Sequence, residues 1–222
     1  MGGVHTTAFG MQRTDEELVA LAITGDSESF NELVRRWERQ IYALAYRVLG
    51  REEEARDVCQ ETFLRAFRGI KGFKGQAKFS SWLYRIALNL CRDWIRKERR
   101  SAVMTPLDAD GEAPLPDLTV ETAEARTVRR DLGRLMTDAM ATLSEDQRTT
   151  IVLKEYHGLT FQEIADLQDS PLSTVKTRLY QGLSVLRKQL RRKGVHGTAT
   201  LSAVPTASLM ARSHRKVVNL DR

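Results

Sequence analysis

The sequence predicts an all-α protein with two small helical domains joined by a flexible acidic linker. Apolar residues recur at spacings of three and four over residues 14–100 and again over residues 127–193, as amphipathic helices require. Residues 101–126 lack this periodicity and contain three prolines, which prevent a continuous helix there. The chain has 222 residues, of which 41% are hydrophobic, and this is enough for two small packed cores.

Three helices are expected in the first part of the N-terminal domain. Residues 1–13 show no periodicity and are expected to be disordered. A short helix begins after Thr14, which can form a capping box with Glu17, and a long helix runs from Asp26 to Gly50. A third helix starts near Arg51. Its inner face is predicted to consist of Ala55, Val58, Cys59, Thr62, Phe63, Ala66 and Phe67, and its outer face of Asp57, Gln60, Glu61 and Arg65.

The second part of this domain is basic and aromatic. A glycine-spaced loop at residues 69–76 leads to Ser80 and Ser81, which are good N-cap residues for a helix from Trp82 to Arg100. Residues 65–100 contain eleven bases and two acids, a net charge of +9, and Phe73, Phe79, Trp82 and Tyr84 are interleaved with these charges. This composition is typical of surfaces that hold single-stranded nucleic acid. The alternative is a solvated basic face over an aromatic core.

The linker has the opposite charge. Residues 101–126 contain six acids and one base, a net charge of −5. The linker is interpreted either as a solubilising tether or as an acidic strand that occupies a basic channel in a partner. The tail at residues 194–222 has a net charge of +3 and a composition that predicts disorder.

The C-terminal domain is predicted to end in a helix-turn-helix. Helices are expected at residues 127–143 and 148–156, and Ser144 can cap the second of them together with Gln147. Two further helical patterns are separated by a short turn at residues 168–172, which is the helix-turn-helix arrangement.

The last helix of this domain is strongly basic. Ser173 is expected to be its N-cap. Residues 171–193 contain seven bases and no acid, a net charge of +7. We therefore expect this helix to enter a DNA major groove.

Several functional classes are disfavoured by the sequence. Cys59 and Cys91 lack the paired spacing of zinc ligands and are expected to be buried thiols, and His157 has no partner at metal or triad spacing. Without a metal cluster, a phosphate loop or a nucleophile–base pair, neither a cofactor nor an enzymatic activity is expected. The longest apolar runs are too short for a membrane span, and the N-terminus lacks a signal-peptide pattern, so a cytoplasmic protein without membrane insertion is expected.

Three blocks of the chain resemble a known family. They are DVCQETFLRAFRGIKGF, FSSWLYRIALNLCRDWIRKERR and LSEDQRTTIVLKEYHGLTFQEIADLQDSPLSTVKTRLYQGLSVLRK. In this order they resemble bacterial extracytoplasmic-function (ECF) sigma factors of RNA polymerase over about residues 14–193. The resemblance implies a sigma region 2 bundle at residues 14–100 and a sigma region 4 helix-turn-helix at residues 127–193.

The resemblance also implies partners and roles for individual residues. Expected partners are core RNA polymerase, through its beta-prime clamp coiled coil and beta flap, promoter DNA, and an anti-sigma factor. The polymerase-binding candidates are Asp57, Gln60, Glu61 and Arg65. The candidates for the −10 element are Lys74, Gln76, Lys78, Phe79, Trp82, Arg85, Asn89, Arg92, Asp93 and Arg96. The candidates for the −35 element are Ser173, Thr174, Lys176, Thr177, Arg178 and Gln181.

The chain departs from the family pattern at three places, and one of them is Ser173, which replaces a glycine at the start of the recognition helix. Housekeeping sigma factors have two adjacent tryptophans where this chain has Trp82 and Leu83, which implies weaker melting and stricter promoters. Trp82 is open to two interpretations, a base contact or a core residue. At the turn, Asp169 stands where many relatives have glycine, and aspartate tolerates the left-handed conformation better than most residues. A stand-alone helix-turn-helix regulator of transcription remains the alternative function.

Overall fold

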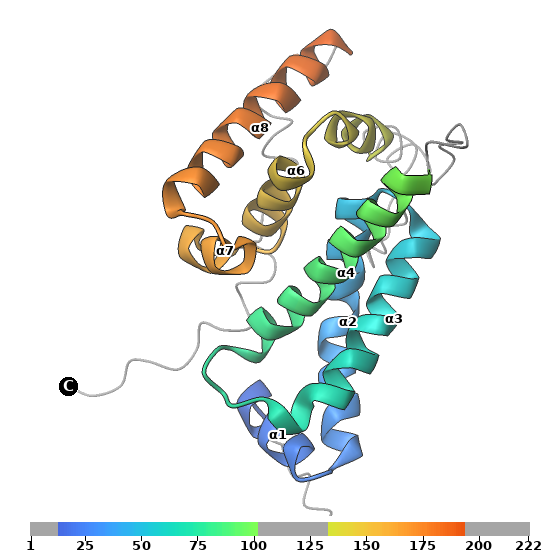
Figure 1. Ribbon diagram of the computed structural model, residues 1–222, viewed down its shortest axis with the longest axis vertical. Coiled ribbons are helices and arrows are strands. Elements are labelled where there is room, and N and C mark those ends of the chain that lie inside the picture. Colours follow the sequence, from blue (N-terminus) through green and yellow to red (C-terminus); the bar gives the residue numbers. More distant parts are fainter. Residues whose placement is uncertain (1–12, 102–132, 194–222) are drawn as a thin grey trace, which may run out of the picture.

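The computed structural model describes residues 13–101 and 133–193 (Figure 1). Within these two ranges the chain forms helices and no strand, which confirms the all-α prediction. Residues 1–12, 102–132 and 194–222 lie outside the described residues. They include nearly all of the predicted disordered N-terminus (1–13) and acidic linker (101–126), the whole predicted tail (194–222) and the start of the helix predicted at 127–143.

The N-terminal helices begin and end where the local sequence favours it. They are α1 (Asp15–Ile23), α2 (Ser27–Leu49), α3 (Glu52–Gly69), the 3₁₀ turn η1 (Ile70–Gly72) and α4 (Phe79–Ser101). The predicted capping box is present, because the Thr14 side chain accepts from the Glu17 N–H and the Glu17 carboxylate accepts from the Thr14 N–H. Gly50 ends α2 in the left-handed conformation with φ 77°. These signals are local, so the sequence alone identifies them.

The C-terminal helices follow a helix at residues 133–141. They are α6 (Glu145–Ile151), the π-helical turn η2 (Val152–Tyr156), α7 (Phe161–Gln168) and α8 (Leu172–Arg192). The capping box of Ser144 and Gln147 is present. The predicted α-helix over residues 148–156 is only partly correct. It changes to a π turn after Ile151, in which the N–H of His157 donates to the carbonyl of Val152, five residues earlier, at 3.3 Å.

Two further expectations about the N-terminal domain are corrected. Helix α4 starts at Phe79, so Ser80 and Ser81 lie inside its first turn and not at the N-cap. Phe67 is 55% exposed, whereas an inward position was expected. Because Phe63 and Ala66 already occupy the inner face of α3, Phe67 lies at its edge, where its ring packs against Phe30 at a centroid distance of 5.1 Å.

Each group of helices has a core of aliphatic side chains. The largest fully buried side chains include Leu33, Ile41, Leu44, Leu83 and Leu88 in the first group and Val152, Leu153, Ile164, Val175 and Leu186 in the second. At Gly182 a Cβ atom would lie 2.8 Å from Cδ1 of Ile151. Helices α6 and α8 thus approach each other at a point where a larger residue does not fit.

The two groups of helices also pack on one another. Helix α7 lies beside the first half of α4, and η2 and α6 contact α2 (Figure 1). This places the first helix of the helix-turn-helix over the basic helix of the N-terminal domain.

Candidate functional surfaces

Helix α8 carries an exposed polar face. Of the six residues predicted to read DNA, four are exposed, namely Ser173, Lys176, Thr177 and Gln181. Thr174 and Arg178 are partly buried. The turn before α8 has the predicted backbone, because Asp169 adopts the left-handed conformation with φ 47° and ψ 48°.

The side chain of Arg178 is bound inside the helix-turn-helix. Its Nη1 donates to Oε1 of Gln168 at 3.1 Å and to Oγ of Ser170 at 2.9 Å. Its Nη2 lies 2.5 Å from Oδ2 of Asp146 at the start of α6. Gln168 is 8% exposed and is also bonded to the hydroxyl of Thr150. Arg178 therefore ties the recognition helix to the turn and to α6.

The N-terminus of α8 differs from the expectation in one respect. The N-cap residue is Pro171, which makes no side-chain cap, and Ser173 lies within the first turn. Since no side chain caps these N–H groups, the positive end of the helix dipole faces outward at the start of the recognition helix. Such an end suits a phosphate group.

Tyr180 is the residue on this face that the sequence reasoning missed. It is 64% exposed, and it follows Lys176 by four residues and Thr177 by three on the same side of α8. The sequence carried a signal for this residue. The spacing of Tyr180 places it on the side of α8 that holds the polar residues and not on the side of the apolar residues Val175 and Leu179.

A second polar face runs along α4. Lys74, Gln76 and Lys78 are exposed in the loop before the helix, and Arg85, Asn89, Asp93 and Arg96 are exposed along it, while Arg92 is partly buried. Arg85, Asn89, Asp93 and Arg96 are spaced by three and four, so these four residues form one strip. Nη1 of Arg92 donates to Oδ1 of Asn89 at 3.3 Å, and Arg96 pairs with Asp93 at 3.5 Å.

The aromatic residues at the start of α4 form a cluster. Phe79 is 5% exposed and packs edge-on against Phe73 at a centroid distance of 6.3 Å. Trp82 is partly buried, with its ring 5.0 Å from that of Phe73, and its Cζ2 would lie 3.2 Å from a Cβ atom at Gly69. Core packing thus accounts for Phe79 and for one side of Trp82.

The outer face of α3 borders an apolar groove. Asp57, Gln60 and Arg65 are exposed as expected, and Glu61 is partly buried and pairs with Arg65 at 2.8 Å. Between α2 and α3 lies a groove of about 830 Å³. Its lining includes Phe30, Tyr42, Gln60, Phe63, Leu64 and Phe67. Leu64 is 43% exposed, so the groove presents apolar surface beside the polar face.

Residues 13–101 and 133–193 contain no group of three or more His, Cys, Asp or Glu side chains that could hold a metal ion, and no helix there is long and apolar enough to cross a membrane. Cys59 and Cys91 are buried free thiols, and burial raises the pKa of each to about 12. This confirms the expectation of buried thiols, and a raised pKa disfavours the reactive thiolate form.

Each of the two domains matches a known family of protein domains. Residues 33–101 match Sigma-70 region 2, and residues 133–186 match Sigma-70, region 4. The ECF RNA polymerase sigma-E factor of Haemophilus influenzae is 33% identical over 186 residues, which cover 81% of this chain and 97% of the relative. The chain belongs to the ECF sigma factors of RNA polymerase. Sigma factors are initiation factors of transcription and not enzymes.

Further relatives of this sigma factor support the same family. The ECF RNA polymerase sigma factor SigW of Bacillus subtilis is 37% identical over 180 residues, which cover 75% of this chain and 91% of the relative. Among solved structures, CnrH in complex with the cytosolic domain of CnrY has 25% identity and a TM-score of 0.58, covering 80% of this sigma factor and 97% of that chain. RpoE from Bartonella quintana, in complex with the anti-sigma factor NepR, has a TM-score of 0.61 and 21% identity, covering 74% of this sigma factor and 98% of that chain. At this identity the two proteins are similar in fold alone.

Polar contacts join the two regions of the sigma factor. Region 2 here denotes the described residues 13–101, and region 4 denotes residues 133–193. Nζ of Lys78 lies 3.1 Å from Oε1 of Glu163, and Nη2 of Arg85 donates to the carbonyl of Asp166 at 2.9 Å. Nη1 of Arg148 donates to the carbonyl of Val48 at 2.9 Å. Two of the predicted −10 residues, Lys78 and Arg85, are therefore bound by α7.

Two aromatic contacts lie beneath these polar ones. The Tyr84 hydroxyl and Nδ1 of His157 are 3.1 Å apart, and their rings meet edge-on. The guanidinium of Arg47 lies over the ring of Tyr156 at 4.3 Å. Nε2 of His157 is buried and has no hydrogen-bond partner among the described residues. Burial, and then the charge of Arg47, lower the pKa of His157 to about 3.

Proposed function

We propose that this ECF sigma factor docks on core RNA polymerase through α3, contacts the −10 element through α4 and the loop before it, and reads the −35 element through α8. The observation that carries the proposal is the presence of two exposed polar faces on separate helices of separate regions, α4 and α8. A protein with this arrangement can hold two DNA segments at once.

Polymerase docking is assigned to the outer face of α3 and to the groove beside it. Asp57, Gln60, Glu61 and Arg65 offer charged and polar groups, and Leu64 and Phe67 add exposed apolar surface at the groove. A polar rim around an apolar centre is the composition of many protein–protein interfaces. A helical partner that packs along α2 and α3, such as the clamp coiled coil, fits this surface.

The −10 element is assigned to Lys74, Gln76, Lys78, Arg85, Asn89, Arg92, Asp93 and Arg96, with Phe79 supporting the loop from the core. Basic groups along one strip hold phosphates, and the accessible side of Trp82 can stack on an unpaired base. A flipped base costs a few kcal/mol of stacking and pairing, which these contacts offset.

The −35 element is assigned to the first turns of α8. Ser173, Lys176, Thr177 and Gln181 face outward, Thr174 lies beside them, and Arg178 holds the helix in position. The uncapped N–H groups at the start of α8 are suited to a phosphate, and Arg187, Lys188 and Arg191 extend the basic surface along the helix.

The cellular setting follows from the family. We infer action in the cytoplasm, where core polymerase and promoter DNA are found, control by an anti-sigma factor, and a regulon that responds to stress or to the cell envelope. The sigma factor of Bartonella quintana to which this chain is similar in fold is bound to an anti-sigma factor. We also propose region boundaries at residues 14–100 and 127–193.

A run-off transcription assay with core polymerase tests the proposal. Genomic fragments bound by the holoenzyme serve as templates, and core polymerase without the sigma factor is the control. We expect discrete transcripts that depend on the sigma factor. Equal transcription by core polymerase alone would refute promoter recognition.

A stand-alone helix-turn-helix regulator is the competing function, because α8 could read duplex DNA without polymerase. The discriminating variant reverses the charges on α3, Asp57→Lys with Arg65→Glu. As a sigma factor, the variant loses binding to core polymerase and keeps binding to duplex DNA. A stand-alone helix-turn-helix regulator would not bind polymerase, either as the original chain or as the charge-reversed variant.

A further inference from the structure

Gly69 allows the ring of Trp82 to rest against the end of α3. Gly69 is the last residue of α3, and a Cβ atom at this position would lie 3.2 Å from Cζ2 and 3.6 Å from Cη2 of Trp82. The first distance is shorter than the optimal separation of about 3.5–4.0 Å between carbon atoms. Gly69 has φ −92° and ψ −10°, a right-handed conformation that does not require glycine. The space taken by the ring is therefore what excludes a side chain here.

The backbone beneath the ring is held in place by its own contacts. Ile70, which follows Gly69, is 3% exposed, and its carbonyl accepts from the N–H of Phe73 at 3.0 Å. Helix α1 packs on this turn, η1. Since these contacts fix the turn, a side chain at residue 69 would displace the ring of Trp82 and not the backbone.

The ring of Trp82 has a fixed neighbour on α4 and an accessible one in the loop. Phe79 is 5% exposed, and its ring lies 5.9 Å from that of Trp82. Phe73 is partly exposed, and its ring lies 5.0 Å from that of Trp82 at an interplanar angle of 38°. Trp82 is also partly exposed, and Lys74 and Lys78 in the loop before α4 are exposed. An accessible aromatic surface close in sequence to two lysines suits an unpaired base and its phosphates.

We propose that Gly69 is a positioning residue of the −10 surface: its missing side chain holds the ring of Trp82 at the place and tilt at which an unpaired base stacks on it. This inference rests on the proposed −10 role of α4 and the loop before it. Gly69 acts through the ring of Trp82 and not by touching the DNA. A displaced ring overlaps less with the base, so binding of the unpaired strand weakens.

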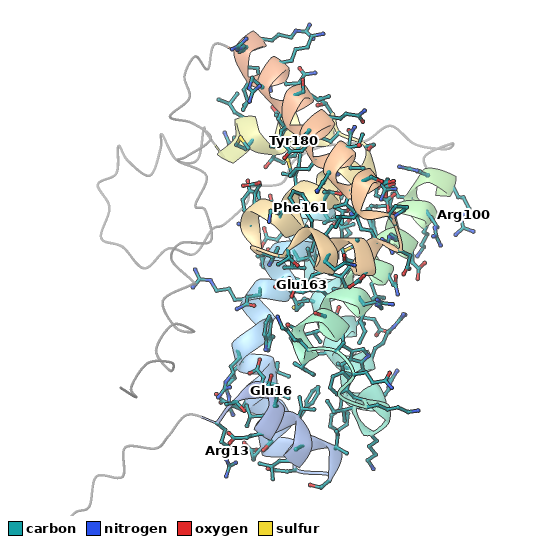
Figure 2. The ribbon with its side chains drawn as sticks, turned by 90° about the vertical axis from the view of Figure 1, so that its left-hand side faces the viewer. Arg13, Glu16, Arg100, Phe161, Glu163 and Tyr180 are labelled. Carbon is teal, nitrogen blue, oxygen red and sulfur yellow. The ribbon has the colours of Figure 1, made fainter. Side chains whose placement is uncertain are left out.

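Gly72 is the matched control for substitutions at Gly69. It lies three residues later in the same turn and is exposed, and no atom beyond its chain neighbours would lie within 4 Å of a Cβ atom there. The recognition face of region 4 is a second control. In Figure 2, Glu16 of α1, the helix that packs on η1, and Tyr180 of α8 lie toward opposite ends of the view. Substitutions at Gly69 should therefore leave binding of a −35 duplex unchanged.

The first test follows the position of the ring in the full chain by fluorine NMR. 5-Fluorotryptophan labels Trp37, Trp82 and Trp94, and the Trp82 resonance is the one that Trp82→Leu removes. We expect Gly69→Ala to shift this resonance and Gly69→Val to shift it further. Gly72→Ala and Gly72→Val should leave it in place. An unmoved Trp82 resonance in Gly69→Val would overturn the proposal.

The second test measures promoter binding by the holoenzyme. The probe is the promoter fragment that gives the strongest sigma-dependent run-off transcript, with its −10 segment mismatched so that both strands are unpaired. We expect the dissociation constant to rise about fivefold in Gly69→Val and about tenfold in Trp82→Leu, and to stay unchanged in Gly72→Val. Unchanged binding to core polymerase shows that region 2 of each variant is folded. If Gly69→Val does not pass this check, the smaller Gly69→Ala takes its place, with an expected rise of about twofold.

A double-mutant cycle separates positioning from a general structural effect. If Gly69 acts through the ring, Gly69→Val should have no further effect on binding of the mismatched promoter in a Trp82→Leu chain. A loss of affinity that adds to that of Trp82→Leu would refute the positioning role.

The outcomes also separate the inference from the function on which it rests. If Trp82→Leu binds the mismatched promoter like the original chain, while Lys74→Ala or Asn89→Ala weakens binding, the −10 assignment stands and the role of Gly69 is refuted. If none of these variants changes binding of the mismatched promoter, the −10 assignment fails and the inference fails with it.

Discussion

Replacing Arg178 with alanine should weaken the −35 contact by loosening the recognition helix. Arg178 makes three polar contacts, with Asp146, Gln168 and Ser170, and its side chain is 23% exposed. A hydrogen bond to a charged group contributes about 1.5–3 kcal/mol when shielded, and less where solvent reaches it. Since the Asp146 side chain is 49% exposed and Gln168 keeps its bonds with Thr150, we expect Arg178→Ala to lower the free energy of unfolding of region 4 by about 2 kcal/mol.

Urea unfolding of the whole chain can assign this loss to one region. The three tryptophans, Trp37, Trp82 and Trp94, all lie in region 2, so tryptophan fluorescence follows region 2 and circular dichroism follows both regions. In Arg178→Ala the circular dichroism transition should begin at lower urea, while the fluorescence midpoint moves less. Duplex DNA binding should weaken in the same variant.

Lys176→Ala is the matched control. Lys176 is exposed, and its ammonium lies 5.8 Å from the centroid of the Phe161 ring. Its removal should weaken duplex binding and leave unfolding nearly unchanged. If Arg178→Ala behaved like Lys176→Ala, losing DNA binding at full stability, then Arg178 would leave its network to read DNA directly, and the structural role would be wrong.

Three further predictions concern the packing of region 4 on region 2, the thiols and the core. His157 has a pKa of about 3 while region 4 packs on region 2 and an ordinary pKa of 6.5 when exposed. The separated regions therefore bind more protons below pH 6.5, so their packing should be unaffected above that pH and weaken about tenfold per pH unit from 6.5 towards 3, seen as a falling Lys78–Glu163 contact in proximity labelling. A constant contact down to pH 5 would contradict this. Cys59 and Cys91, with thiol pKa values near 12, should resist iodoacetamide at pH 8 in the folded chain and react fully in urea; fast labelling of the native chain would count against their burial. Gly182→Val should lower the stability of region 4 by about 2–3 kcal/mol, because its side chain meets Ile151 and Gln147, and a midpoint like that of the original chain would show that α6 and α8 move apart freely.

Features set by residues close in sequence were predictable. The capping boxes of Thr14 with Glu17 and of Ser144 with Gln147 depend on side chains three residues apart. The left-handed turn at Asp169 and the end of α2 at Gly50 likewise follow from one residue type in a local context. The helix-turn-helix and the exposed face of α3 follow from apolar periodicity alone.

Features set by distant residues were not predictable in this way. Arg178 resembles a base-reading arginine in sequence, and only the proximity of Asp146, 32 residues earlier, shows its internal role. The contact of Tyr84 with His157 joins residues that are 73 positions apart, and neither residue belongs to a sequence pattern that predicts the contact. Phe67 has the spacing of a core residue, but its exposure depends on how α2 covers α3.

The π-helical turn η2 sets the rotation of everything that follows it. The hydrogen bond from His157 to Val152 spans five residues, whereas the hydrogen bonds of an α-helix span four, so this turn contains one extra residue. Each residue turns an α-helix by about 100°. Deleting one residue from this turn would restore α-helical spacing and swing His157 away from Tyr84, while every DNA-facing and polymerase-facing side chain kept its identity. The packing of region 4 on region 2 therefore depends on the number of residues in this turn, which an insertion or deletion can change without altering the side chains assigned to DNA.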